Sequence, residues 1–228
     1  MSYTKTIVCF ANSRKLSGRC VAGREWDGRG FGAWIRPISA CEKGELNIER
    51  YYEGWKDPEL LDVIEMTLLG PQPSGYQTEN HLVDASVRWR PVGRATLGNL
   101  VSAIERPTGA LWINGDSTGN GRNDKVRSEV AERLPNSLIL VQPEQMTMVV
   151  ATEGSDFSNP RRRVRGHFSL AGHDYVLAVT DPVVEGQMKQ SPDGSRTELR
   201  NPVLCISLSE KFDAQNACYK LVAGVMHV

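Results

Sequence analysis

Short apolar segments rich in β-branched residues dominate both ends of this chain, separated by glycine, proline and polar residues. Segments of this kind predict β-strands, and clear examples are residues 6–11 near the start and 202–208 near the end. Helical periodicity is confined to one stretch, from about residue 96 to 134. Strands and helices therefore do not alternate, which argues against an α/β fold and favours small closed or half-closed β-barrels.

The central stretch predicts two helices, each followed by a proline. Thr96 is the expected N-cap of the first helix, and Asn123 or Asp124 is that of the second. Their apolar stripes consist of Leu97, Leu100, Val101 and Ile104, and of Val126, Val130 and Leu134.

Turn and loop signals separate the remaining strands. Residues 12–18 are polar and basic and predict a loop, and residues 185–201 predict a long polar loop. Residues 83–89 alternate loosely and predict a strand. Gly172 and His173 lie between two strand patterns and predict a hairpin turn.

Charge is balanced overall but unevenly distributed along the chain. The sequence has 27 basic and 27 acidic residues, which argues against strong nonspecific binding to nucleic acid. Residues 12–40 are nevertheless mainly basic, and residues 42–65 are mainly acidic. A basic strip of this kind can form a local anion site.

Cysteine and apolar patterns narrow the class of protein further. The five cysteines show no C-x-x-C spacing, and no histidine pair has ligand spacing, so we expect reduced thiols and no metal or cofactor. No apolar run approaches the roughly 20 residues of a membrane helix. Residues 7–11 are too short for the apolar core of a secretory signal. We therefore expect a cytoplasmic protein that does not bind membranes.

Three groups of motifs, in this order and spacing, resemble one family. They are 7–13 with 18–23 and 34–37, then 77–80, and finally 175–181 with 204–208 and 218–223. Together they resemble the dual OB-fold domain family of prokaryotes over residues 5–226. The resemblance implies a mainly β chain with two OB-like barrels, at 1–95 and 138–228, and a short helical connector at 96–137. It also implies binding of nucleic acid or nucleotides, with single strands favoured, often beside defence genes.

The first candidate ligand site lies in the basic strip near the N-terminus. Serine and asparagine side chains can hold phosphate oxygens, arginine offers a two-pronged donor, and tryptophan can stack on a base. Its residues are Asn12, Ser13, Lys15, Arg19, Trp34 and Arg36. The alternative is structural, with Arg36 in an ion pair and Trp34 in the core. Because aromatic residues are only 7% of the chain, arginine contacts are expected to outweigh base stacking.

Two further groups are candidates for the same ligand. Gln77, Glu79 and Asn80 can read base edges, although a capped turn explains them equally well. Arg163 and Arg165 would share one face of a strand and could hold phosphates, or could instead protect an edge strand.

Functional alternatives remain open at this point. The main hypothesis is a non-enzymatic protein that binds nucleic acid or nucleotides. A protein–protein interaction module is the second, and we expect Asp181 and Lys220 to form a structural pair in any of these cases. The third is a nucleotide-processing enzyme that uses Cys20 or Ser13, although the four histidines lie far from both in sequence.

Overall fold

The chain forms two compact units, each with its own sheet and core. The computed structural model describes residues 2–41, 43–154 and 160–227. Unit 1 comprises Met1–Ile104 with Pro135–Ser137, and unit 2 comprises Glu105–Leu134 with Leu138–Val228. The expected connector at 96–137 is thus divided between the two units.

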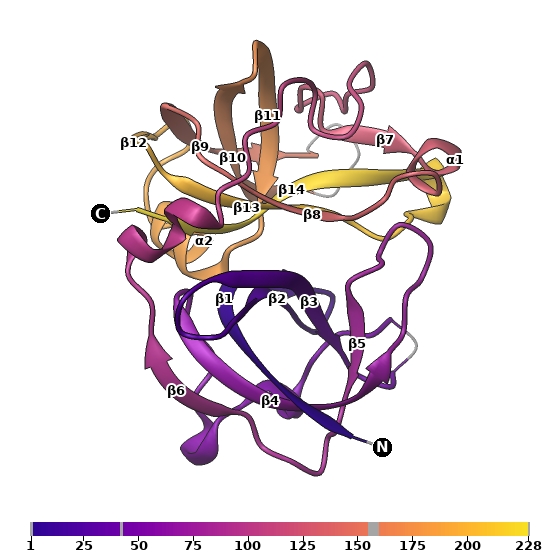
Figure 1. Cartoon of the computed structure of the whole chain (residues 1–228). Coiled ribbons are helices and arrows are strands. Elements are labelled where there is room, and N and C mark those ends of the chain that lie inside the picture. The colour runs from indigo at the N-terminus through magenta and orange to yellow at the C-terminus, as the bar shows by residue number, and fades with distance from the viewer. Residues whose placement is uncertain (1, 42, 155–159, 228) are drawn as a thin grey trace. The chain divides into compact units, whose positions relative to one another are not determined.

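Unit 1 is a closed barrel of five strands. The first three strands form an antiparallel meander, the third pairs in parallel with the fifth, and the fourth pairs with both the fifth and the first. This ring is the connectivity of an OB-fold, and its indigo and purple strands curve around one interior in Figure 1. The strands are β1 (Tyr3–Lys15), β2 (Gly18–Trp26), β3 (Phe31–Ile38), β4 (Asp62–Pro71) and β5 (Asn80–Val83), and β6 (Arg90–Arg94) pairs with β4.

Alternate residues of these strands fill the interior of unit 1. Ile7 and Cys9 of β1, Val21 of β2, Ile35 of β3 and Ile64 of β4 belong to one buried cluster. Their neighbours in sequence point to the outer face, because successive side chains of a strand alternate. Three short 3₁₀ helices complete the unit: η1 (Ile48–Arg50), η2 (Glu53–Trp55) and η3 (Leu97–Ser102).

Gly23 is required where β1 and β2 approach each other most closely. A Cβ atom at this position would lie 2.1 Å from the carbonyl oxygen of Val8, which is a backbone atom and cannot rotate away. We expect Gly23→Ala to lower the free energy of unfolding by about 2 kcal/mol through this overpacking. Urea unfolding of the variant measures the loss. Gly30→Ala is the control, because nothing lies within 4 Å of its added Cβ, and an equal loss there would contradict the explanation.

Unit 2 repeats the same strand connectivity with additional elements. Its first three core strands, β9, β10 and β11, are antiparallel neighbours, and β11 pairs in parallel with β14. A helix, α2, follows the third strand, as in an OB-fold. The elements are β7 (Lys125–Arg127), α1 (Ser128–Ala131), β8 (Leu138–Val141), β9 (Gln145–Glu153), β10 (Arg161–Leu170), β11 (His173–Val179), α2 (Pro182–Met188), β12 (Arg196–Arg200), β13 (Val203–Leu208), η5 (Asp213–Gln215) and β14 (Ala217–Met226).

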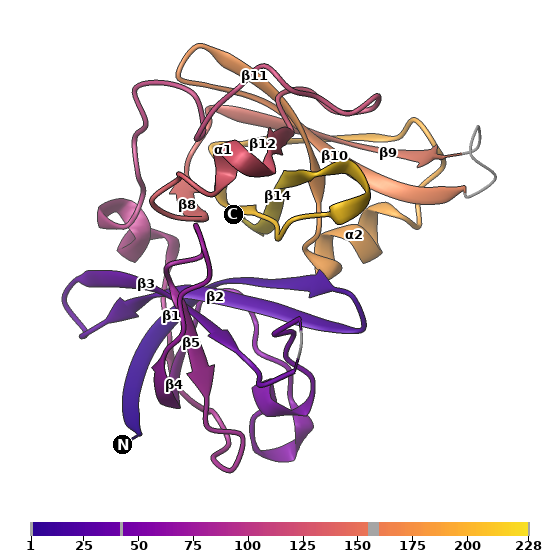
Figure 2. The same ribbon diagram turned by 90° about the vertical axis from the view of Figure 1, so that its right-hand side faces the viewer.

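Strands β12 and β13 together act as the fourth strand of this barrel. Only Asn201 and Pro202 separate them, and β12 pairs with β9 whereas β13 pairs with β14. Figure 2 shows β9, β10 and β11 side by side as long strands of the unit. Met146, Val150 and Leu177 are among the buried residues of its core.

The expected fold class is confirmed, but several local expectations are wrong. Residues 125–127 form strand β7 rather than the start of a helix, because Val126 pairs with Cys218 of β14. The helical segment that follows, α1, has only 4 residues. The first predicted helix is the 3₁₀ helix η3, and its Thr96 N-cap forms the capping box with Asn99.

The predicted loops also differ from the structure. Strand β1 continues through residues 12–15 and turns within two residues, because the polar side chains there have partners inside unit 1. Residues 196–200 form strand β12 within the expected long loop. The predicted strand at 83–89 gives way to a turn in which Asp84 accepts hydrogen bonds from Ser86. The hairpin at residues 171–172 is confirmed, with φ positive at both turn residues.

Candidate nucleic-acid interface

Two of the predicted N-terminal residues meet at the half-buried carboxylate of Asp57. Asn12 donates from Nδ2 to Oδ1 of Asp57 at 3.0 Å and to the carbonyl of Pro58 at 2.7 Å. Arg50 binds both carboxylate oxygens at 2.7 and 3.0 Å, and Arg19 lies 3.8 Å from one of them. Burial alone would raise the pKa of Asp57, but the hydrogen bonds from Arg50 and Asn12 outweigh it and hold this pKa below its usual value. The network thus joins the segment before β4 to the β1–β2 hairpin.

The neighbouring residues of the hairpin have local contacts. The Ser13 hydroxyl donates to the carbonyl oxygen of Cys20 across the hairpin at 3.3 Å. Lys15 is half-buried at the end of β1, opposite Gly18. In the described residues, the Ser13 hydroxyl thus binds a backbone carbonyl and not a side chain that could act as a catalytic base.

Trp34 belongs to an aromatic cluster on the outer face of β1–β3. Its ring packs edge-on against Phe10 with centroids 5.8 Å apart. Phe31 lies 5.6 Å from Phe10 and 4.6 Å from Trp26. The four rings come from three strands, and because Phe10 is fully buried, a base-stacking surface in unit 1 would be formed by the half-buried Trp26, Phe31 and Trp34.

Arg36 and the Gln77–Asn80 segment, which the sequence suggests as separate sites, come together in unit 1. Arg36 is 2% exposed, lies 3.5 Å from Glu79 and pairs in register with Asn80 of β5. Glu79 also accepts hydrogen bonds from the hydroxyl and the backbone N–H of Ser137. Asn80 donates to Gln77 at 3.3 Å. The structural alternative stated for Arg36 therefore describes its surroundings well.

Arg165 is held between two carboxylates of unit 2. It binds Glu153 through two hydrogen bonds of 2.7 and 2.9 Å and Asp124 at 3.2 Å. Burial would lower the pKa of Arg165, but these carboxylates raise it overall, and Arg165 in turn lowers the pKa of Glu153 against the effect of burial. Arg163 lies 3.7 Å from Glu153 and is more exposed. Arg165 therefore shapes the sheet surface while its own charge is largely neutralised.

The expected pair of Asp181 and Lys220 is wrong. Asp181 caps α2 through the backbone N–H of Val183 and accepts a further hydrogen bond from Val225. Lys220 instead donates to the carbonyl of Ile113 at 2.6 Å and to Asn114 at 2.8 Å. Asp181 thus stabilises α2 and contacts β14, whereas Lys220 binds the segment at residues 113–114.

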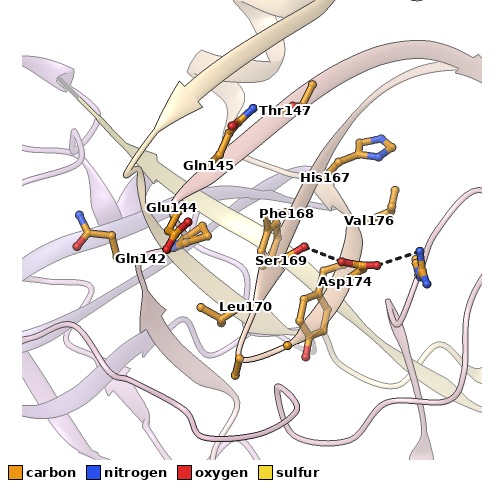
Figure 3. Close-up of a pocket in the computed structure, with 15 residues that line it drawn as sticks. Gln142, Glu144, Gln145, Thr147, His167, Phe168, Ser169, Leu170, Asp174 and Val176 are labelled. Carbon is orange, nitrogen blue, oxygen red and sulfur yellow. Dashed lines mark hydrogen bonds and ion pairs between the residues drawn. The ribbon is translucent and has the colours of Figure 1, made fainter.

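A groove of about 760 Å³ lies on the outer face of β9–β11 in unit 2. Outward-facing polar side chains of these strands line it together with apolar residues, among them Phe168 and Leu170. Figure 3 shows the lining side chains of β9 (Gln145 and Thr147), β10 (His167 and Ser169) and β11 (Asp174). The polar side chains that line the groove include Arg122, Gln145, Thr147, His167, Ser169 and Asp174.

The sides of the groove are fixed by hydrogen bonds and by charge. The Ser169 hydroxyl donates to Asp174 at 2.6 Å (Figure 3), and Arg122 lies 3.2 Å from the other oxygen of that carboxylate. Burial lowers the pKa of His167, and the positive charges of Arg196 and Arg165 lower it further. The imidazole therefore lies where the local potential is positive, although the chain has no net charge.

Comparison with known proteins decides the family. The sequence model of the dual OB-containing domain matches residues 5–225, nearly the whole chain. The chain belongs to the dual OB-containing domain family. A search among curated proteins finds no match.

In this dual OB-containing domain, the groove covers the second and third strands of one barrel, β10 and β11, and the adjoining first strand, β9. OB-folds bind oligonucleotides on this pair of strands. Sequence analysis missed Gln145, Thr147 and His167 in the groove and Arg196 on the same sheet face, because their positions depend on the register of β9, β10 and β12. A signal was present in the alternation of polar and apolar residues from 145 to 148 and from 167 to 170.

Among residues 2–41, 43–154 and 160–227, no three His, Cys, Asp or Glu side chains are grouped as metal ligands. No helix in the same residues has the length and apolar character needed to cross a membrane.

Proposed function

We propose that this dual OB-containing domain binds single-stranded nucleic acid along the outer face of β9–β11 in unit 2. The observation that carries the proposal is the position of the groove, which covers the strand pair used by OB-folds for oligonucleotides. Its volume falls within the roughly 300–1,000 Å³ range of ligand pockets. Gln145, Thr147 and Ser169 supply amide and hydroxyl groups that can bind base edges or sugars.

Positive charge for the phosphates would come from three exposed or half-exposed arginines. Arg196 and Arg122 lie beside the groove, and Arg163 extends the same sheet face along β10. The ion pair of Arg122 with Asp174 is exposed, so it is weak and can exchange for a phosphate contact. Arg165 supports the face rather than binding a phosphate directly, because two carboxylates already hold it. Trp34 and its aromatic neighbours are proposed as a second contact surface, in unit 1.

Salt dependence gives a quantitative test of this proposal. With two or three phosphates contacted, the affinity for a single strand should fall roughly tenfold between about 50 and 200 mM salt. Fluorescence anisotropy with labelled single-stranded RNA, single-stranded DNA and duplex DNA measures this. We expect at least one of the two single strands, RNA or DNA, to bind more tightly than the duplex. Absence of binding to all three at low salt would exclude a polynucleotide ligand.

A charge introduced into the groove tests its location. Thr147 lies on the groove floor, and Thr147→Glu should weaken single-strand binding at least tenfold by repelling phosphates. Thr67→Glu is the matched control, since Thr67 is a half-buried outer residue of β4 in unit 1. Equal affinity of the two variants would place the ligand elsewhere.

A further inference from the structure

His167 lies at the centre of a row of cross-strand neighbours in unit 2. It pairs in register with Thr147 of β9 and with Val176 of β11, and Thr147 pairs with Glu198 of β12. In the adjacent row, Arg165 faces Val149, which in turn faces Arg196. Since residues two apart on a strand share a face, the imidazole and the two guanidinium groups project from the same side of the sheet.

The charged groups around His167 come from every neighbouring strand. On its own strand, Arg165 is neutralised by Glu153 and Asp124. On β12, Glu198 and Arg200 are exposed on the same face as Arg196. Arg196, Glu198 and Arg200 lie beside the groove and do not line it.

The other two neighbouring strands, β11 and β9, add little net charge near His167. Asp174 of β11 is held by Ser169 and Arg122. The facing residues of β9, Gln145 and Thr147, are uncharged. Among the described residues, the protonation of His167 is therefore governed by its burial and by the arginines. Both favour the neutral imidazole.

We infer that the end of the groove at His167, beside which Arg196 projects from the same face of the sheet, is a phosphate subsite, in which binding of the anion is accompanied by uptake of one proton from solvent onto the imidazole. This inference rests on the proposed function, because it names the part of the nucleic acid that this end of the groove receives. A phosphate beside His167 offsets the positive potential of the arginines and accepts a hydrogen bond from the protonated ring. Neutral His167 alone can offer only one N–H donor.

The proton uptake has a definite sign in the affinity. The pKa of His167 is below its usual value in the free protein and rises in the complex, so the complex carries more protons over the interval between the two values. The affinity for a single strand is therefore higher at about pH 5.5 than at about pH 8, by roughly tenfold for each unit by which the pKa rises. His167→Gln keeps a polar side chain but removes the titration, and should make the affinity independent of pH in this range.

The experiment combines binding and nuclear magnetic resonance on the full chain. Anisotropy is recorded from about pH 5.5 to 8 with a single strand and with the same sequence carrying an uncharged methylphosphonate backbone. The imidazole pKa of His167 is followed with the same strands and with sulfate, whose charge is constant in this range. His173→Gln is the matched control, because His173 lies at the adjacent hairpin but does not line the groove.

Each outcome decides between the inference and the proposed function. A raised pKa of His167 with the phosphate strand, and pH-dependent affinity lost in His167→Gln but kept in His173→Gln, supports both. Binding of the strand with an unchanged pKa of His167 overturns the subsite and leaves the proposed function standing. A raised pKa with sulfate without binding of any strand supports an anion subsite and overturns the polynucleotide function. No effect of either ligand overturns both.

Discussion

Replacing Asp124 by alanine is expected to lower the free energy of unfolding by about 3 kcal/mol. The Asp124 carboxylate is buried and accepts hydrogen bonds from the backbone and hydroxyl of Thr118, at 2.8 and 2.6 Å, and from Arg165. Its charge also acts on the buried Lys220. Removal of one partner from a buried ion network leaves the remaining charges poorly compensated, which typically costs about 3–5 kcal/mol. We expect the lower end because Arg165 keeps its two hydrogen bonds with Glu153.

Urea unfolding of matched variants measures this effect. Asp124→Asn keeps one acceptor oxygen for Thr118 but removes the charge, and should fall between wild type and Asp124→Ala. Asp116→Ala is the control, because its ion pair with Arg127 is partly exposed and should contribute less than about 1 kcal/mol. A loss in Asp124→Ala no larger than in Asp116→Ala would show that the network does not stabilise unit 2.

Lys220 should make stability depend on pH in the alkaline range. The side chain is fully buried, and burial lowers its pKa to about 8 despite the nearby charge of Asp124. The unfolded chain releases this proton only near the ordinary value of 10.5. Between the two values the unfolded state carries the extra proton, so the free energy of unfolding rises with pH. Relative to Lys220→Met, wild type should gain about 2 kcal/mol between about pH 7.5 and 10.

The comparison with Lys220→Met isolates this lysine from other titrating groups. Both proteins are unfolded with urea at several pH values, and the difference in free energy is plotted against pH. Because the variant lacks the ammonium donors to Ile113 and Asn114, its absolute stability will also change. Only the slope tests the explanation. A difference that stays constant with pH would mean that Lys220 keeps its ordinary pKa.

Sequence patterns predicted the strands whose apolar residues face a core. Residues 6–11 and 202–208 contain enough β-branched and apolar side chains for local preference and burial to agree. The hairpin at 171–172 was predicted because its turn chemistry is local. Strand β12 was missed, since Leu199 is its only buried side chain and the other residues are polar. The strand at 125–127 was missed because Val126 also fits a helical stripe, and only its pairing with Cys218 decides the matter.

The candidate residues come together through contacts between segments that are far apart in the sequence. No local sequence pattern predicts such contacts. Asn12 and Arg19 meet because Asp57 lies between them, about 40 residues further along the chain. Arg36 meets Glu79 because β3 and β5 are parallel neighbours. The run of arginines at 161–165 suggested a phosphate-binding strand, but residues 124 and 153 neutralise Arg165 and leave Arg163 as the more exposed member.

The polar residues of the two units thus fall into two kinds. Those in unit 1 mostly join buried networks, such as those around Asp57 and Glu79. The groove of unit 2 instead presents amide, hydroxyl and imidazole groups on an outer sheet face. We therefore propose the outer face of β9–β11 in unit 2 as the ligand surface.

Photochemical cross-linking tests this placement most directly. A single-stranded RNA containing 4-thiouridine is cross-linked to the full-length chain, and the modified residues are mapped by mass spectrometry. The account predicts cross-links within residues 145–149 and 165–176, and their loss in Thr147→Glu. Cross-links found only in other segments, with these strands unmodified, would contradict it.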